Sequence, residues 1–255
     1  MASSLVTLAR NLQQRKGRKR TGLAVAEGVR LVEEALQSGI PIQGALASRS
    51  LETAPRGTEL LEELAARSIS IHRVADGTLA DLADTETPQG ILAIVEPPIV
   101  HLDSILPLPG APVVVLDAVQ DPGNAGTLLR TAFGLGAGGA ILLKGSADLT
   151  NPKVLRAAMG ASFQLPVARA TQPEFAEWVE TTQTEIWVAA ISGTPLAQVS
   201  RPEYLTFVVG NEGAGVRDEV ARHATQRVAI PLAHGAESLN VAIAAGIILY
   251  EVQRG

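Results

Sequence analysis

Residues 121–139 read DPGNAGTLLRTAFGLGAGG, and the order of patterns in this stretch decides the fold class. The run GLGAGG at 134–139 fits the G-x-G-x-x-G fingerprint of dinucleotide-binding proteins, in which a strand precedes the glycines and a helix follows them. Here the helical pattern TLLRTAF comes first, and the apolar strand-like run AILLK at 140–144 comes afterwards. We therefore interpret the glycines as the end of a helix that turns into a strand.

The alternation of helix and strand continues after this stretch. PVVVLDAV at 112–119 is a continuous apolar run, which is typical of a buried parallel strand. The later patterns predict further strands and helices; the strands are expected at 165–170, 186–191, 206–210 and 227–232, and the helices at 151–160, 173–183 and 238–254. We predict an α/β domain with a parallel sheet over residues 111–255.

The first part of the chain alternates in the same way on a smaller scale. Strands are predicted at 23–28, 42–48, 69–75 and 89–96, and helices at 29–39, 58–68 and 77–83, with Thr58 as a candidate N-cap. Five prolines between 97 and 112 exclude a long regular element there. The expected organisation is a small α/β domain over 1–96, a proline-rich linker over 97–110 and the larger domain over 111–255.

Composition narrows the class of protein. The chain has 255 residues, 46% of them hydrophobic, which supports a substantial core. Its longest apolar run, VAIAAGIILY, is too short for a membrane span, and the first fifteen residues lack a signal-peptide pattern, so we expect a cytoplasmic protein with no membrane partner. With no cysteine and four histidines that form no pair at helical spacing, no metal site is expected.

Three unusual loops follow three of the predicted strands. QDPGNAGTLLR (120–130) follows the first, GNEGAG (210–215) a later one, and PLAHGAESLN (231–240) the last. Each loop alone has a structural explanation, since Asn124 or Ser238 could cap a helix and Glu212 could neutralise a helix N-terminus. Because ligands of open α/β sheets bind beyond the carboxyl ends of the strands, the three loops together predict one site that suits a nucleoside-like ligand.

The ordered set DPGNAGTLLRTA, VVGNEGAGV and IPLAHGAESLNVAIAAGIILYE closely resembles the three motifs of the SpoU/TrmH branch of the SPOUT RNA 2'-O-ribose methyltransferases. The N-terminal half resembles that family's L30e-like substrate-binding domain, through AEGVRLVEEALQSG and TPQGILAIVE. The resemblance implies a SPOUT-type parallel-sheet domain with a deep trefoil knot, S-adenosylmethionine as the cofactor, and a homodimer that uses the last helix. It also implies RNA as the substrate, with 23S rRNA favoured over tRNA by the two-domain layout.

The resemblance further assigns roles to residues of the three motifs. The implied catalytic set is Asn124 and Arg130 as the principal residues, with Glu212, Ser238 and Asn240 organising the site. The implied cofactor-binding set is Val209, Gly210, Asn211, Ile230, Leu232, Ser238 and Leu239. A guanidinium group stays charged in proteins, so we expect Arg130 to bind the phosphate beside the target ribose rather than to act as a base. Where the family usually has glycine, this chain has His234, which is either an ordinary loop residue or a group that narrows the cofactor pocket.

A cluster of basic residues lies near the N-terminus, in ARNLQQRKGRKR at 9–20. The net charge of the chain is −5, but a local group of Lys and Arg can still bind phosphates by releasing counterions. With an RNA partner implied, the expected RNA-binding residues are Arg15, Lys16, Arg18, Lys19, Arg20 and Arg30. Aromatic residues make up only 3% of the chain, so backbone and shape recognition should dominate over base stacking.

Three alternatives stay open at this point. A dehydrogenase that uses GLGAGG would bind NADH rather than S-adenosylmethionine. A tRNA 2'-O-methyltransferase would carry the same three motifs. A non-catalytic RNA-binding or ribosome-assembly factor could keep the fold without turnover.

Overall fold

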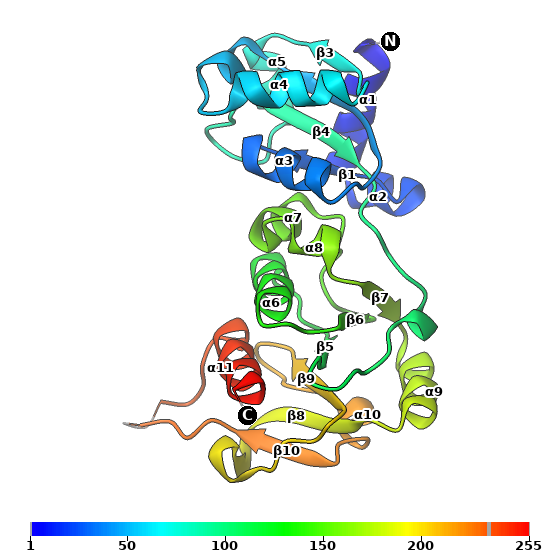
Figure 1. Cartoon of the computed structure of the whole chain (residues 1–255), viewed down its shortest axis with the longest axis vertical. Helices are drawn as coiled ribbons and strands as arrows, with labels where there is room; N and C mark the ends of the chain where they lie inside the picture. Colours follow the sequence, from blue (N-terminus) through cyan, green and yellow to red (C-terminus); the bar gives the residue numbers. More distant parts are fainter. Residues whose placement is uncertain (1, 234–235, 255) are drawn as a thin grey trace. The chain divides into compact units, whose positions relative to one another are not determined.

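The computed structural model describes residues 2–233 and 236–254, and its contacts divide the chain into two compact units (Figure 1). Unit 1 contains residues up to Pro98 together with Asp148–Phe163, and unit 2 contains Ile99–Ala147 and the chain from Gln164 onward. Asp148–Phe163 therefore packs with the N-terminal residues, although the sequence boundaries group it with the larger domain. His234, whose effect on the cofactor pocket was left open, lies outside the described residues.

Unit 1 is built on a four-stranded sheet of order β1-β4-β2-β3, in which only the β2–β3 pair is parallel. Its strands are β1 (Ala24–Glu27), β2 (Ile42–Ala47), β3 (Ile71–Arg73) and β4 (Ile91–Val95). Its helices are α1 (Ala2–Gln13), α2 (Arg15–Thr21), α3 (Val29–Gln37), the 3₁₀ helix η1 (Arg49–Thr53), α4 (Gly57–Ala66), α5 (Asp76–Leu82), α7 (Pro152–Ala158) and α8 (Ala161–Gln164).

Alternation along the strands of unit 1 creates two hydrophobic cores. Ile91, Ala93 and Val95 of β4 face the core formed with α3 and α4. Leu92 and Ile94 face the opposite core, formed with α1 and α5. Because both faces are covered, β4 has an uninterrupted apolar sequence. Thr58 was wrong as the N-cap of α4, because the helix begins at Gly57 and Arg56 holds the cap position in a left-handed conformation.

Unit 2 contains a six-stranded, all-parallel sheet of order β10-β8-β9-β5-β6-β7. Its strands are β5 (Val113–Asp117), β6 (Gly139–Leu143), β7 (Val167–Ala170), β8 (Glu185–Pro195), β9 (Leu205–Gly210) and β10 (Gln226–Ala229). Its helices are η2 (Leu102–Ser104), α6 (Pro122–Gly134), α9 (Gln172–Thr182), η3 (Leu196–Gln198), α10 (Asp218–Ala221) and α11 (Val241–Gln253). Figure 1 shows α6 and α11 on one side of this sheet and α9 and α10 on the other.

The order of elements around GLGAGG is confirmed, since α6 ends at Gly134 and β6 begins at Gly139. No helix N-terminus follows these glycines, so they do not form the phosphate loop of a dinucleotide-binding fold. The proline-rich segment contains η2 and packs on unit 2, where Ile105 is buried and its carbonyl accepts a hydrogen bond of 2.8 Å from the indole N–H of Trp178. Among the described residues, no helix is both long enough and apolar enough to cross a membrane.

Candidate active site

The side chains of Asn124, Glu212 and Asn240 join three loops that are far apart in the sequence. Asn124 lies in the first turn of α6 after β5, Glu212 follows β9, and Asn240 is the N-cap of α11. Asn240 Nδ2 donates to Asn124 Oδ1 over 2.9 Å, and Asn124 Nδ2 donates to Glu212 Oε1 over 3.0 Å. Because β5 and β9 are adjacent parallel strands, this network lies at their carboxyl ends, where such sheets bind ligands.

The helix cap of α11 fixes the direction of this network. Asn240 Oδ1 accepts hydrogen bonds from the backbone amides of Ala242 and Ile243, at 3.0 and 3.3 Å. Its Nδ2 must therefore be the group that faces Asn124, which turns the oxygen of Asn124 toward Asn240 and its nitrogen toward the carboxylate of Glu212. Asn240 rather than Ser238 is the cap residue, and Asp121 rather than Asn124 caps α6 by accepting from the Asn124 amide over 2.8 Å.

Glu212 holds the loop after β5 in place. Its carboxylate accepts from the backbone amides of Gln120, at 3.4 Å, and Asp121, at 3.2 Å, as well as from Asn124. Partial burial raises the pKa of the Glu212 carboxyl group, but the hydrogen bonds from Asn124 and from these amides outweigh burial, so the pKa lies below its ordinary value. Glu212 is therefore an ionised organiser of the site and a poor acceptor for a substrate proton at neutral pH.

The loop that carries Glu212 is closed tightly on itself. Asn211 and Gly215 exchange two backbone hydrogen bonds of 2.9 Å, and Asn211 Oδ1 accepts from the amides of Gly213 and Ala214, both at 3.0 Å. A Cβ atom on Gly210 would lie 2.1 Å from the carbonyl carbon of Gly215, so this position admits only glycine. Asn211 Nδ2 also donates to the carbonyl of Ala118 over 3.0 Å, which ties the loop to the end of β5.

A buried ion pair that the sequence analysis did not predict connects the end of β5 to the chain after the Glu212 loop. Asp117, the last residue of β5, is completely buried, and its carboxylate accepts from the backbone amide and from Nε of Arg217, both at 2.8 Å. Arg217 precedes α10, so the pair fixes the chain that leaves the Glu212 loop. The sequence did contain a signal for this pair: Asp117 ends the apolar run VVVLD, and a charged group that is buried with such a run requires a partner of opposite charge.

Part of β8 departs from the pairing with β10, and we call this part the excursion of β8. The sequence analysis predicted an uninterrupted strand at 186–191. The pairing of β8 with β10 passes from Val188 opposite Arg227 to Thr194 opposite Val228, so residues 189–193 leave the ladder. Ile191 in this excursion is 81% exposed. A Cβ atom on Gly193 would lie 2.7 Å from the Arg227 carbonyl oxygen, which explains the glycine where the strand returns.

The other predicted site residues have different environments. Val209 is buried within β9, so only its backbone is available to a ligand, and Ile230 is half-buried just beyond β10. Leu232 and Leu239 are each 37% exposed, although both are apolar. Ser238 is exposed, and no hydrogen bond of its side chain occurs among the described contacts.

Arg130 is not part of the network. It is exposed on α6, six residues after Asn124, which places the two side chains about 120° apart around the helix. Within the described part of the chain, no hydrogen bond or ion pair to its guanidinium group is found. The structure thus joins Asn124, Glu212 and Asn240 and leaves Arg130 directed to solvent.

The basic residues of unit 1 divide into two groups. Five of the six expected RNA-binding residues are exposed, namely Arg15, Lys16, Lys19, Arg20 and Arg30. Arg18 is buried, and its guanidinium group donates to the carbonyls of Leu12 and Gln13 and to Asp148. An RNA contact through Arg18 is therefore not supported, because its donors already serve the protein.

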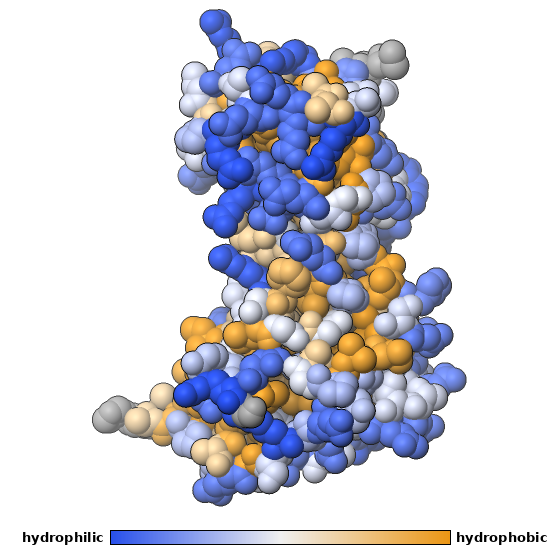
Figure 2. All heavy atoms as spheres, viewed as in Figure 1, coloured by the Kyte–Doolittle hydropathy of each residue, from blue (hydrophilic) through white to orange (hydrophobic). Residues whose placement is uncertain are grey.

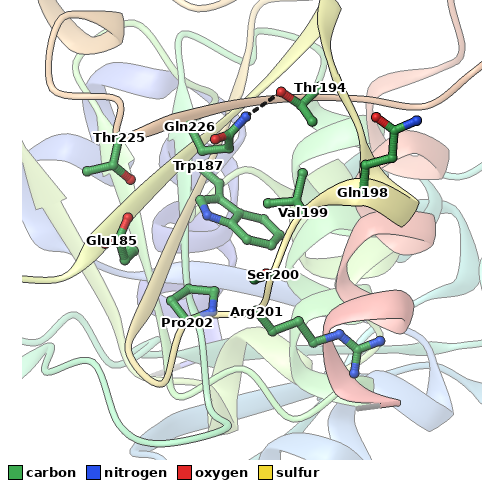
Figure 3. A pocket seen from close by; sticks show the side chains of 10 residues that line it. All are labelled: Glu185, Trp187, Thr194, Gln198, Val199, Ser200, Arg201, Pro202, Thr225 and Gln226. Carbon is green, nitrogen blue, oxygen red and sulfur yellow. Dashed lines mark hydrogen bonds between the residues drawn. The ribbon is translucent and has the colours of Figure 1, made fainter.

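A pocket of about 390 Å³ lies elsewhere in unit 2 (Figure 3). It is lined by residues of β8, by the segment from η3 to β9 and by the start of β10, and none of the predicted site residues lines it. Gln226 and Thr194 already bond to each other over 2.7 Å, and Trp187 is almost completely buried. In the described part of the chain, no group of three or more histidine, cysteine, aspartate or glutamate residues is arranged to hold a metal ion.

Comparison with known proteins relates both units to described domains. The family model of SpoU rRNA methylases matches residues 111–250, and that of MRM3-like substrate-binding domains matches residues 4–93. The 23S rRNA (guanosine(2553)-2'-O)-methyltransferase RlmP of Bacillus subtilis is 33% identical over 245 residues, which cover 96% of this chain and 94% of that protein.

Two solved structures resemble the chain over nearly its full length. The AdoMet-bound rRNA methyltransferase from Sinorhizobium meliloti has a TM-score of 0.87 and 33% identity, covering 98% of this chain and 94% of that chain. The SpoU methyltransferase AviRb from Streptomyces viridochromogenes, in complex with AdoMet, has a TM-score of 0.85 and 30% identity, covering 97% and 95%. The three joined loops, the parallel sheet and these matches lead to one conclusion: the chain belongs to the SpoU rRNA methylase family.

Proposed function

We propose that this protein transfers a methyl group from S-adenosylmethionine to a ribose 2'-hydroxyl of 23S rRNA. The observation that carries the proposal is the Asn124–Glu212–Asn240 network, which joins the three family motifs at the carboxyl ends of the parallel strands. RlmP is named for 2'-O-methylation of 23S rRNA, and its similarity extends through the N-terminal unit, which supports rRNA over tRNA as the substrate.

The residues around the network fit the proposed cofactor. Adenosine has apolar faces, and three exposed apolar side chains could contact them: Ile191 lies in the excursion of β8, Leu232 follows β10, and Leu239 precedes the N-cap of α11. We expect these side chains, with Ile230 and the backbone of Val209, Gly210 and Asn211, to hold S-adenosylmethionine, and Ser238 to lie beside it. When bound, this cofactor supplies an electrophilic methyl group, so the protein has to orient the hydroxyl and provide for its proton.

Orientation of the target ribose is the task we assign to Asn124 and Arg130. Asn124 has its oxygen and one N–H engaged by Asn240 and Glu212, which leaves a second N–H in a fixed direction for the substrate. Arg130 is free to bind the phosphate beside that ribose and to lower the pKa of the hydroxyl by its charge. If the role of Arg130 depends on planar, bidentate contact, Arg130→Lys should lose most of the rate, and nearly full rate with an unchanged pH profile would refute it.

The exposed cations of unit 1 provide a platform for the RNA backbone. Arg15, Lys16, Lys19 and Arg20 lie on the single short helix α2, and Arg30 lies at the start of α3. Grouped charges of this kind bind phosphates without reading base sequence. Figure 2 shows that unit 1 presents a mostly hydrophilic face in this view.

A homodimer would explain the exposed side of α11. Ile243, Ile247 and Tyr250 are exposed at i, i+4 and i+7 spacing, while Ala245 and Leu249 on the opposite side of the helix are buried. We propose that a second copy covers this stripe, since an apolar helix face of this kind is typical of an interface. The proposal also includes the trefoil knot, which the family resemblance implies. The domain borders at 96 and 111 and a cytoplasmic location belong to it as expectations from the sequence.

The decisive experiment is transfer of labelled methyl from S-adenosylmethionine to unmodified 23S rRNA and, in parallel, to tRNA. Arg130→Ala should abolish labelling, whereas Arg222→Ala, which changes an exposed arginine outside the three motifs, should not. One labelled rRNA position that resists alkaline cleavage supports the proposal. Labelled tRNA would favour the alternative substrate, and cofactor binding without label in either RNA would favour the non-catalytic factor.

A further inference from the structure

We propose that Arg18 and Asp148 form a positioning pair that holds the basic helix α2 in its RNA-binding arrangement. This inference rests on the proposed RNA-methylating function. Both residues belong to unit 1, although 130 positions separate them in the sequence. Arg18 is the one cation of α2 that faces inward, whereas Arg15, Lys16, Lys19 and Arg20 are exposed.

The guanidinium group of Arg18 closes the corner between α1 and α2. One of its terminal nitrogens donates to the carbonyls of Leu12 and Gln13, at 3.0 and 2.9 Å. These carbonyls end α1, where the helix itself supplies no donors. Its Nε donates to Asp148 Oδ2 over 3.3 Å, and the two side chains are only 6% and 8% exposed.

Asp148 is itself held in place by its neighbours. Its Oδ1 accepts from the amide and the hydroxyl of Thr150, at 3.3 and 2.9 Å, and its Oδ2 accepts from Arg18. The helices that follow are anchored in unit 1, because Leu155 and Phe163 are buried in the core that contains Leu51 and Leu60. Asp148 is therefore a fixed acceptor and not a mobile surface carboxylate.

A second link anchors the same segment. Arg156 Nη1 lies 3.4 Å from the buried carboxylate of Glu27 in β1, and Nη2 of the same arginine contacts Asp84. Glu27 also accepts from the amides of Asp84 and Thr85, at 2.8 and 3.2 Å. Asp148–Phe163 lies within the residues that the SpoU methylase model matches, yet it completes the unit that carries the basic helix α2.

Helix α2 needs this support because it has only seven residues. A helix of that length is unstable without tertiary contacts, and four repelling cations on it disfavour it further. If Arg18 and Asp148 hold it, the four exposed cations are arranged before RNA arrives and little conformational entropy is lost on binding. The negative charge of Asp148 then increases RNA affinity, although simple electrostatics predicts that an acid beside a phosphate-binding surface lowers it.

The positioning role and simple electrostatics predict opposite changes in RNA affinity when the charge of Asp148 is removed. The full-length protein, with unmodified 23S rRNA as the probe, can therefore distinguish them. Asp148→Asn should weaken RNA binding about tenfold and raise KM for RNA, while kcat at saturating RNA and S-adenosylmethionine affinity stay unchanged. Glu62→Gln is the matched control, since this exposed glutamate of α4 loses the same charge without touching α2. Hydrogen exchange of the α2 amides should accelerate in Asp148→Asn and not in the control.

Arg18→Lys separates positioning from phosphate binding. Lysine keeps the charge but cannot reach two carbonyls and a carboxylate in one plane, so RNA affinity should fall as in Asp148→Asn. Equal or tighter RNA binding by Asp148→Asn, with unchanged exchange of α2, overturns the inference. If the wild-type protein neither binds nor methylates the RNA, the proposed function fails instead, so the two failures are distinguishable.

Discussion

Replacement of Glu212 by glutamine should disable the site while leaving the fold intact. The carboxylate accepts from Asn124 and from the amides of Gln120 and Asp121. Glutamine offers one acceptor oxygen, and its NH₂ group would face donors that it cannot bond. Hydrogen bonds to charged groups contribute about 1.5–3 kcal/mol each, with the lower value appropriate at this exposed position.

Loss of one to two such bonds corresponds to about 1.5–3 kcal/mol, which is a decrease of about tenfold to one hundredfold in kcat/KM. The assay is labelled methyl transfer to 23S rRNA at saturating S-adenosylmethionine, with thermal unfolding measured in parallel. Glu219→Gln, an exposed glutamate of α10, is the matched control. A Glu212→Gln enzyme with kcat/KM within about twofold of wild type would refute the organising role of this carboxylate.

The pKa direction of Glu212 adds a pH dependence. Because the folded state lowers the pKa of Glu212, the carboxylate contributes stability that is fully present above its ordinary, unfolded-state pKa and is lost as pH falls through the folded value. Between pH 6 and 9 its ionisation should therefore not shape the rate profile. A wild-type activity limb near neutral pH that disappears in Glu212→Gln would contradict this.

Four further changes test other parts of the structure. Asn240→Ala removes the cap of α11 and the partner of Asn124, so it should cost about 1 kcal/mol in thermal unfolding and most of the methyl-transfer rate, whereas Asn240→Asp should keep the stability and lose the rate. Asp117→Asn leaves Arg217 beside a buried neutral amide and should lower the free energy of unfolding by about 3 kcal/mol in urea titration; a loss below about 1 kcal/mol would contradict the buried pair. Gly193→Ala places a methyl group against the Arg227 carbonyl, so calorimetry should detect weaker binding of S-adenosylmethionine, and unchanged binding would separate the β8 excursion from the cofactor site. Ile247→Glu should convert the proposed dimer into monomers in light scattering, with Glu177→Gln on α9 as an exposed control that stays dimeric.

Local patterns in the sequence were enough to predict most of the elements and the class of fold. VVVLD is buried on both faces in β5, and the helix-before-strand order around GLGAGG, which argued against a dinucleotide loop, is present in the structure. The ordered motifs also contain Asn124, Glu212 and Asn240, the three side chains that meet in the structure, whereas Arg130, which the same motifs singled out, lies outside that network. These inferences succeed because hydrophobic periodicity and turn residues act within a few positions of each other.

Tertiary structure alone decided which residues are partners. Arg18 lies in an ordinary basic run, yet a carboxylate 130 positions away makes it an internal support. Asp117 pairs with Arg217 because β5 lies beside β9 and the loop that follows it, and Gly193 is required where β8 returns to β10 because the Arg227 carbonyl oxygen lies close to it. The sequence by itself thus determined the elements and the motif loops, whereas long-range packing determined burial and charge pairing, since both depend on neighbours that no local pattern specifies.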